Sequence, residues 1–360
     1  NAPQTMKPTT TSIHALALAC CVGSALPAFA QLRVANWNVS SYGGADAARD
    51  PAFKAALYGA FSGRTFAPDV LICQEFTSLG GVTAFLTNLN SASGSPGDWA
   101  ASAFVDGPDT DSIVFYRTSK VQSPAVTTVA TGGASPNHPR NIMRYDIKPI
   151  GYTGAAATIA CYSTHMKSST DADSQARRLL EAQRIRDNAQ TLPAGWNFLI
   201  SGDFNIQKSS EAAYQEMVGS QANNTGRVFD PIKSPGGGTS SDTWYSQSTQ
   251  RFIHTQAPGG SDPQQTGGMD DRFDQILLSA SLIDGTGFDY IGNPNIAYST
   301  TTWNDPNHSY RCWGNDGSSY NLVLTITGNA MVGQTIAQAL HDSTGADAAG
   351  GHLPVYLDLR

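Results

Sequence analysis

Polar side chains that could bind a cation or transfer a proton stand at the ends of several strand-like segments of this sequence. In chain order they are Asn38, Glu75, His165, Asp203, Asn205, Asp274 and His352. A strand tolerates such residues at its exits, because a side chain there can reach a cleft without being buried among apolar neighbours. Each residue alone is weak evidence, so the two most informative segments are considered first.

The segments "LICQEF" and "LISGDFN" carry the most specific chemistry. Glu75 follows an apolar run that begins at Val70. A half-buried carboxylate needs a cation or hydrogen-bond donors, and oxygen ligands suit Mg²⁺, Mn²⁺ or Ca²⁺ better than zinc. In the second segment, Gly202 permits a tight turn, and Asp203 and Asn205 fall on one side of an extended chain. These two can position a water molecule and bind a phosphoryl oxygen; the simpler alternatives are a surface glutamate and an Asx turn.

The elements that must position these residues are short strands mixed with a few helices. Strand-like runs cover residues 31–39, 69–75, 111–117, 140–150, 156–165, 197–205, 272–279 and 352–359. Helical spacing is found at 173–192, 211–220 and 329–343. Because strands and helices do not alternate strictly, we predict an α/β sandwich rather than a doubly wound sheet. No internal repeat or linker divides residues 31–360, which we expect to form one domain.

The first thirty residues have the composition of a secretory signal peptide. Lys7 precedes an apolar run from Ile13 to Val22, and small residues follow in "LPAFA", which ends at Ala30. We therefore expect residues 1–30 to be removed, with residues 1–5 as an upstream extension, and the mature chain to be secreted or periplasmic. The run is too short to span a membrane. An N-terminal helix of the fold and a lipid anchor at Cys20 are the alternatives.

Charge and cysteine content limit the functions of the chain. The net charge is −7 for 360 residues and becomes −8 without Lys7, so the surface is not one that coats nucleic acid. A phosphate substrate is still compatible with this charge if a divalent cation supplies positive charge locally. Cys73, Cys161 and Cys312 lack the spacing of a zinc site, and the first two fit buried strands.

Seven ordered segments together resemble a known family. They are "RVANWNV", "PDVLICQE", "SIVFYRTSKV", "CYSTHMKS", "LISGDFN", "DRFDQILLS" and "GHLPVYLDL". In this order they resemble the successive motifs of the endonuclease/exonuclease/phosphatase superfamily, which includes deoxyribonuclease I-like enzymes. The resemblance covers essentially all of residues 31–360. It implies a four-layer α/β sandwich, two packed mixed sheets flanked by helices, with Mg²⁺ (or Mn²⁺ or Ca²⁺) at a phosphoester-hydrolysing site.

The resemblance also implies roles for individual residues. Glu75 would be the main metal ligand with support from Asn38, and the catalytic set would be His165, Asp203, Asn205, Asp274 and His352. Within this set, His165 would contact the phosphate, Asp203 and Asn205 would orient the attacking water and the phosphate, and Asp274 would hydrogen-bond His352. Asp111 is a candidate orienting acid for His165, and Arg140 and Lys167 are candidate substrate-binding cations.

One departure from the family lies just before the last histidine. Family members usually read Ser-Asp-His, whereas this chain reads Gly350-Gly351-His352. The metal site would therefore lack one acid, which predicts a metal affinity or activity lower by about 10–100-fold. We do not expect Asp347, four residues before Gly351, to replace it.

Three functions remain open from the sequence. The first is an exported, monomeric phosphodiesterase that acts on nucleic acid as an endonuclease. The second is a sphingomyelinase-like phospholipase C, or a phosphomonoesterase, with a lipid headgroup as a possible substrate group. Trp303, Tyr310 and Trp313 could enter a lipid interface, and the simpler alternative is that they pin their loop to the body of the domain. The third is a non-catalytic binding module, weakened by Gly351 in place of the usual aspartate.

Overall fold

The computed structural model describes residues 1–3, 31–233, 244–260, 268–347 and 350–360. The chain divides into two units, 1–30 and 31–360, and the fold described below is that of the second unit. The expected signal peptide lies outside the described residues from residue 4 onward. Among the described residues, none of the helices combines the length and hydropathy that a membrane-spanning segment requires.

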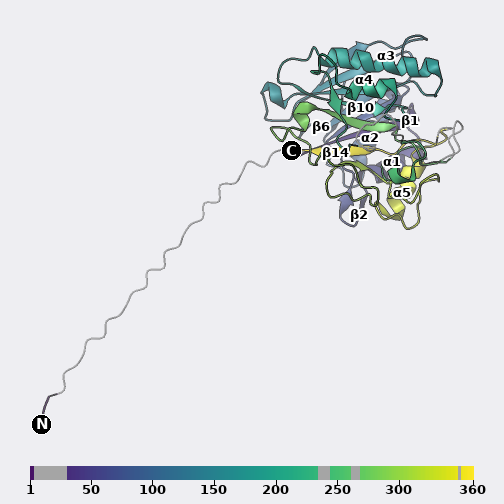
Figure 1. The fold of residues 1–360 in the computed structure, drawn as a ribbon. Helices are drawn as coiled ribbons and strands as arrows, with labels where there is room; N and C mark the ends of the chain where they lie inside the picture. The colour runs from purple at the N-terminus through teal and green to yellow at the C-terminus, as the bar shows by residue number, and fades with distance from the viewer. Residues whose placement is uncertain (4–30, 234–243, 261–267, 348–349) are drawn as a thin grey trace. The chain divides into compact units, whose positions relative to one another are not determined.

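Two six-stranded mixed sheets form the centre of residues 31–360 (Figure 1). The first sheet has the order β13-β14-β1-β4-β6-β5, with bounds Arg311–Cys312, Val355–Leu359, Leu32–Tyr42, Val70–Phe76, Asp111–Arg117 and Trp99–Ala101. The second has the order β11-β12-β10-β9-β8-β7, with bounds Val228–Phe229, Asp274–Ser279, Asn197–Asp203, Ile159–His165, Ile142–Ile147 and Ala125–Ala130. Each sheet contains one parallel pair, β1 with β4 and β9 with β10, and the neighbouring strands are antiparallel. A short hairpin, β2 (Ala60–Phe61) and β3 (Arg64–Thr65), stands apart.

Helices cover the outer faces of both sheets. Helices α1 (Arg49–Tyr58), α2 (Leu79–Ser91) and α5 (Gly333–Asp342) pack in one apolar cluster with the first sheet. Helices α3 (Ala172–Ala189) and α4 (Ala212–Val218) pack with the second, and Figure 1 shows them on the side away from α1 and α5. The predicted four-layer α/β sandwich is therefore confirmed.

Strand alternation decides which side chains enter the space between the sheets. Val34 and Ile72 belong to the cluster that includes the second sheet, whereas Trp37 and Cys73 belong to the helix-side cluster. The same period sends Gln74 inward, where its amide donates to Ser163 Oγ of the other sheet at 3.0 Å. A polar layer thus replaces the apolar core toward the strand ends.

Gly202 has a different role from the predicted turn. It lies within β10, paired with both Thr164 and Gln275, at φ 153°. A Cβ at this position would stand 1.8 Å from the Thr164 carbonyl oxygen, so the close approach of β9 requires glycine. The turn follows Asp203 instead.

The three cysteines of the described domain are free and buried. Cys73 and Cys161 lie inside β4 and β9, as the apolar runs predict, and Cys312 lies in β13. Burial raises the pKa of all three thiols. They pack as small apolar side chains rather than as reactive groups.

Candidate metal and phosphoester site

The predicted site residues converge because of the sheet topology. The parallel strands β1, β4, β9 and β10 end at the same edge of the sandwich, and β12 and β14 start there because they run antiparallel to their neighbours. In the second sheet, His165, Asp203 and Asp274 occupy adjacent positions on three neighbouring strands. Residues far apart in sequence therefore meet at one edge.

Glu75 reaches this edge through an irregularity in β4. Strand alternation after Gln74 would send its side chain toward the helix layer, but Glu75 has φ 67° and the β4–β6 register shifts between Cys73 and Phe76. A non-glycine residue with positive φ is strained, and such strain is often found at functional sites. Ser41 fixes the redirected carboxylate, because its backbone N–H and its hydroxyl both donate to Glu75 Oε2, at 2.8 and 3.0 Å.

Asn38 connects the acids of the two sheets. Its side-chain amide donates to Glu75 Oε1 at 2.8 Å and to Asp203 Oδ2 at 3.1 Å. Its own oxygen accepts a hydrogen bond from the Ser40 backbone N–H at 3.0 Å, which fixes the orientation of the amide. Asn38 is fully buried, so it holds these carboxylates at a set separation.

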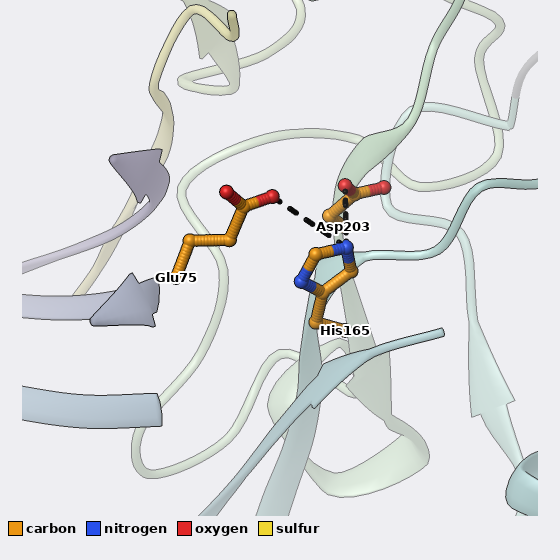
Figure 2. Close-up of side chains that lie close together, drawn as sticks. All are labelled: Glu75, His165 and Asp203. Carbon is orange, nitrogen blue, oxygen red and sulfur yellow. Dashed lines mark ion pairs between the residues drawn. The ribbon is translucent and has the colours of Figure 1, made fainter. Parts of the chain in front are cut away.

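Glu75, His165 and Asp203 form a compact set of potential metal ligands (Figure 2). The Nε2 atom of His165 lies 3.7 Å from Glu75 Oε1 and 3.3 Å from Asp203 Oδ2, and one ligand atom from each residue lies within 4.8 Å of the others. Burial lowers the pKa of His165 far below its usual value, which keeps the imidazole neutral and able to ligate. Hard oxygen donors with one imidazole fit Mg²⁺ or Mn²⁺.

The carboxylates of Glu75, Asp203 and Asp274 lie close enough to repel one another. Burial raises the pKa of Asp203 to about 7, and repulsion from Asp274 and Glu75 contributes to this rise, while attraction to His352 and the hydrogen bond from Asn38 oppose it. A divalent cation would offset this repulsion. The donor set and its electrostatics therefore fit the metal that the family resemblance implies.

His352 and Asp274 form a buried pair beside these ligands. His352 Nδ1 lies 2.7 Å from Asp274 Oδ2, and Nε2 lies 3.5 Å from Asp203 Oδ2. Burial lowers the pKa of His352, but attraction to Asp274 and Asp203 outweighs it and raises the pKa to about 10. The imidazole is therefore charged at neutral pH, with Nδ1 bonded to Asp274 and Nε2 facing Asp203.

The site residues open into a cavity of about 180 Å³. Its lining includes the predicted residues Glu75, Arg140, His165, Asp203, Asn205 and His352. The N–H of Asn205 donates to Asp203 Oδ1 at 3.0 Å, which is the Asx turn that we gave as the simpler alternative. Asn205 nevertheless also lines the cavity. The turn is thus the means by which Asn205 is presented.

Asn38 and Asp274 lie behind the cavity, bonded to residues that line it, whereas Lys167 and Asp111 neither line the cavity nor contact the predicted site residues through the expected hydrogen bonds. Lys167 is absent from its lining, and its ammonium donates to the Ser168 carbonyl at 2.9 Å. Asp111 is buried at the start of β6, and neither its Oδ2 nor His165 Nδ1 has a hydrogen-bond partner among the described residues. Asp111 therefore does not orient His165 in this structure. Burial and the nearby Asp106 and Asp109 raise its pKa to about 6.

Several lining residues could not be found from the sequence. They are Ser168, Ser169, Thr170, Gln207, Gln256, Phe273 and Asp347. Most are uncharged residues on loops, which carry no distinctive spacing. Asp347 is the one acid among them, and it lines the cavity without belonging to the compact ligand set of Glu75, His165 and Asp203.

Gly350 and Gly351 have a structural reason to be glycine. Their φ values are 77° and 69°, and a Cβ would stand 2.4 Å from Ala257 Cβ and from Thr344 Cγ2, respectively. An aspartate at 351 would be both strained and obstructed. The loop before His352 is therefore built differently from a Ser-Asp-His segment.

The aromatic residues proposed to enter lipid lie inside the protein. Tyr310 is fully buried and Trp313 is 1% exposed. Trp303 packs against the core and under the Arg64 guanidinium, whose Cζ lies 5.0 Å from the ring centre. This loop is pinned to the body of the domain rather than presented to a membrane.

Comparison with known proteins gives the fold. No family model matches the sequence, and no curated protein is significantly similar to it. D. rerio TDP2 complexed with a single strand DNA product has a TM-score of 0.51 at 14% identity, over 92% of this chain and 100% of that chain. TDP2 from C. elegans has 0.50 at 13% identity, over 91% and 75%. An endonuclease/exonuclease/phosphatase family protein from Bacteroides thetaiotaomicron has 0.44 at 16% identity, over 91% and 94%.

Identities this low define a fold class only. The chain has the α/β sandwich fold of the TDP2 structures. The activity must be argued from the site itself.

Proposed function

We propose that this chain is a divalent-metal-dependent phosphodiesterase of the endonuclease/exonuclease/phosphatase superfamily, with nucleic acid as its substrate and endonucleolytic cleavage as its activity. One observation carries the proposal. The potential ligands Glu75, His165 and Asp203 share a cavity with His352, which is paired with the buried Asp274 behind it. A cation site beside an acid–base pair is the combination that phosphodiester hydrolysis needs.

Glu75, Asp203 and His165 would hold the cation, and Asn38 would support the site by donating hydrogen bonds to both carboxylates. When bound, the cation would supply Lewis-acid polarisation of a phosphoryl oxygen. Asn205 and Arg140, which line the same cavity, would bind the remaining phosphoryl oxygens. The phosphate would then lie in the cavity at the edge of the sandwich.

The buried acids then account for the proton transfers. Asp203, with its raised pKa, would accept a proton from the water whose oxygen attacks phosphorus. His352, charged and oriented by Asp274, would donate a proton from Nε2 to the leaving oxygen as the P–O bond breaks. The products are a phosphomonoester and an alcohol. The proton on Asp203 can return to His352 across the 3.5 Å that separates their atoms, which restores both residues.

Substrate and location are the finer parts of the proposal. The TDP2 structure with a single strand DNA product shares this fold, which supports a nucleic acid substrate. Burial of Tyr310 and Trp313 removes the feature that favoured a lipid substrate. The composition of residues 6–30 supports export.

The test is hydrolysis of plasmid and single-stranded DNA by the full chain with Mg²⁺ or Mn²⁺, with and without EDTA. We expect metal-dependent internal cleavage that Glu75→Gln removes and the matched control Glu216→Gln, on α4 outside the cavity, retains. Release of phosphocholine from sphingomyelin vesicles without DNA cleavage would contradict the nuclease assignment. Metal binding without hydrolysis of any phosphoester would leave only a binding module.

A further inference from the structure

We propose that Asp347 supplies an additional carboxylate to the cation site and that Arg49 is the residue that positions it. The inference rests on the proposed metal-dependent function. It concerns a residue outside the compact set Glu75, His165 and Asp203.

The first observation is the position of Asp347. It lines the same cavity as Glu75 and His352, although its side chain is only partly buried. Backbone hydrogen bonds fix the chain on both sides of it. The Asp347 N–H donates to the Thr344 carbonyl at 3.3 Å, and the Gly350 N–H donates to the Asp347 carbonyl at 3.0 Å. Asp347 is therefore held at the cavity by its own loop.

The second observation is a buried arginine that joins this loop to the metal side of the site. Arg49 donates to the carbonyls of Val39 and Ser40 at the end of β1, the latter at 3.0 Å. Its Nε donates to the carbonyl of Ser343, just after α5, at 2.8 Å. One guanidinium thus ties the segment after Asn38 to the segment before Asp347. Lysine, a point charge without the planar fork, cannot reproduce all three hydrogen bonds.

The positive charge of Arg49 attracts both Asp347 and Glu75. Burial lowers the pKa of Arg49, and attraction to carboxylates that include Asp347 and Glu75 opposes this. Both acids therefore lie within electrostatic range of the same guanidinium. Arg49 would offset part of the repulsion between them.

The chemistry of Mg²⁺ explains how an acid beyond direct reach can contribute. Mg²⁺ gives up its water reluctantly and is often held by one or two carboxylates plus several waters. Asp347 would accept hydrogen bonds from the hydration shell of a cation held at Glu75. Because Gly351 has no room for a side chain, the loop supplies its acid from position 347 instead.

The experiment measures Mn²⁺ and Mg²⁺ affinity of the full chain by titration calorimetry. We expect Asp347→Asn to weaken binding by about 10-fold or more. The matched control Asp342→Asn, an exposed acid at the end of α5, should leave affinity unchanged. Melting temperatures without metal should agree for all three proteins, which excludes a folding defect.

The outcomes separate this inference from the proposed function. A wild-type chain that binds neither ion contradicts the proposed function. A wild-type chain that binds, with Asp347→Asn equal to it, contradicts the role of Asp347. The role of Arg49 is tested by introducing Arg49→Lys into two proteins, the wild type and the Asp347→Asn variant. We expect the substitution to weaken metal binding more in the wild type than in the variant. Equal losses in both backgrounds would show that Arg49 does not act through Asp347.

Discussion

Replacing Asp274 with asparagine isolates the contribution of the buried carboxylate to His352. Asparagine keeps the size of the side chain and an oxygen acceptor, but it removes the negative charge 2.7 Å from His352 Nδ1. The pKa of His352 should therefore fall, because attraction to Asp274 is the largest influence that raises it. The imidazole would then lose its proton at a lower pH and cease to act as the acid.

The magnitude follows from the hydrogen bond that is weakened. A hydrogen bond to a charged group contributes about 1.5–3 kcal/mol, and about 1.4 kcal/mol changes a rate tenfold. We therefore expect kcat/KM to fall by about 10–150-fold. The alkaline limb of the pH profile, set in the wild type by a pKa near 10, should move toward neutral pH.

The assay is hydrolysis of a bis-aryl phosphate diester by the full chain at saturating Mn²⁺, from pH 5 to pH 10. The matched control is Asp284→Asn, an exposed acid in a surface turn. Wild-type activity and an unchanged alkaline limb in Asp274→Asn would refute the assigned role of His352. If the metal affinity of Asp274→Asn stays within threefold of wild type, its lower kcat/KM arises from weaker proton donation by His352 and not from loss of the bound cation.

Three further predictions concern stability. Gly351→Ala should destabilise the fold by about 1–3 kcal/mol without raising activity, because its left-handed φ and the contact with Thr344 both oppose a Cβ; a gain in activity with an unchanged melting temperature would contradict this. Gly202→Ala should cost about 3 kcal/mol or more or prevent folding, since its Cβ would overlap the Thr164 carbonyl, and a urea midpoint equal to wild type would disprove it. Burial raises the pKa of Glu181 to about 8, so the folded state holds a proton that the unfolded state releases between about pH 4.5 and 8. Stability should thus fall more steeply with rising pH in the wild type than in Glu181→Gln; equal slopes of unfolding free energy in urea denaturation series from pH 5 to 8.5 would contradict the assignment.

Much of the fold could be predicted because buried strands carry continuous apolar runs. The segment 111–117 matches β6, and 69–75 differs from β4 by one residue at each end. Helices α1 and α2 were missed, since the first has a proline in its first turn and the second contains two glycines near its start. Strand β7 was missed because none of its residues is buried and alternation leaves no apolar run.

The site was predictable as a set of residue types but not in its geometry. Asn38, His165 and Asp203 follow from the rule that polar residues at the ends of parallel strands meet at one edge, and Asp274 joins them because its antiparallel strand begins there. The orientation of Glu75 depends on a left-handed backbone that no local pattern in "LICQEF" indicates.

The position of Asp347 could not be predicted for a related reason. It lies on a loop that follows Ser343, whose carbonyl accepts a hydrogen bond from Arg49, a residue almost three hundred positions away in the sequence. The family resemblance predicts the acid at the position before His352, which is Gly351 in this chain, and not at Asp347. Long-range hydrogen bonds of this kind leave no trace in local composition.

The most direct test of the metal-dependent site compares the full wild-type chain with Glu75→Gln in DNA hydrolysis across a titration of Mn²⁺. We predict cleavage that rises with Mn²⁺ and is abolished by EDTA in the wild type, and a loss of at least 100-fold in Glu75→Gln at the same Mn²⁺ concentration, about 3 kcal/mol in transition-state stabilisation. Equal cleavage by the two proteins, or cleavage that persists in EDTA, would contradict a metal site at Glu75.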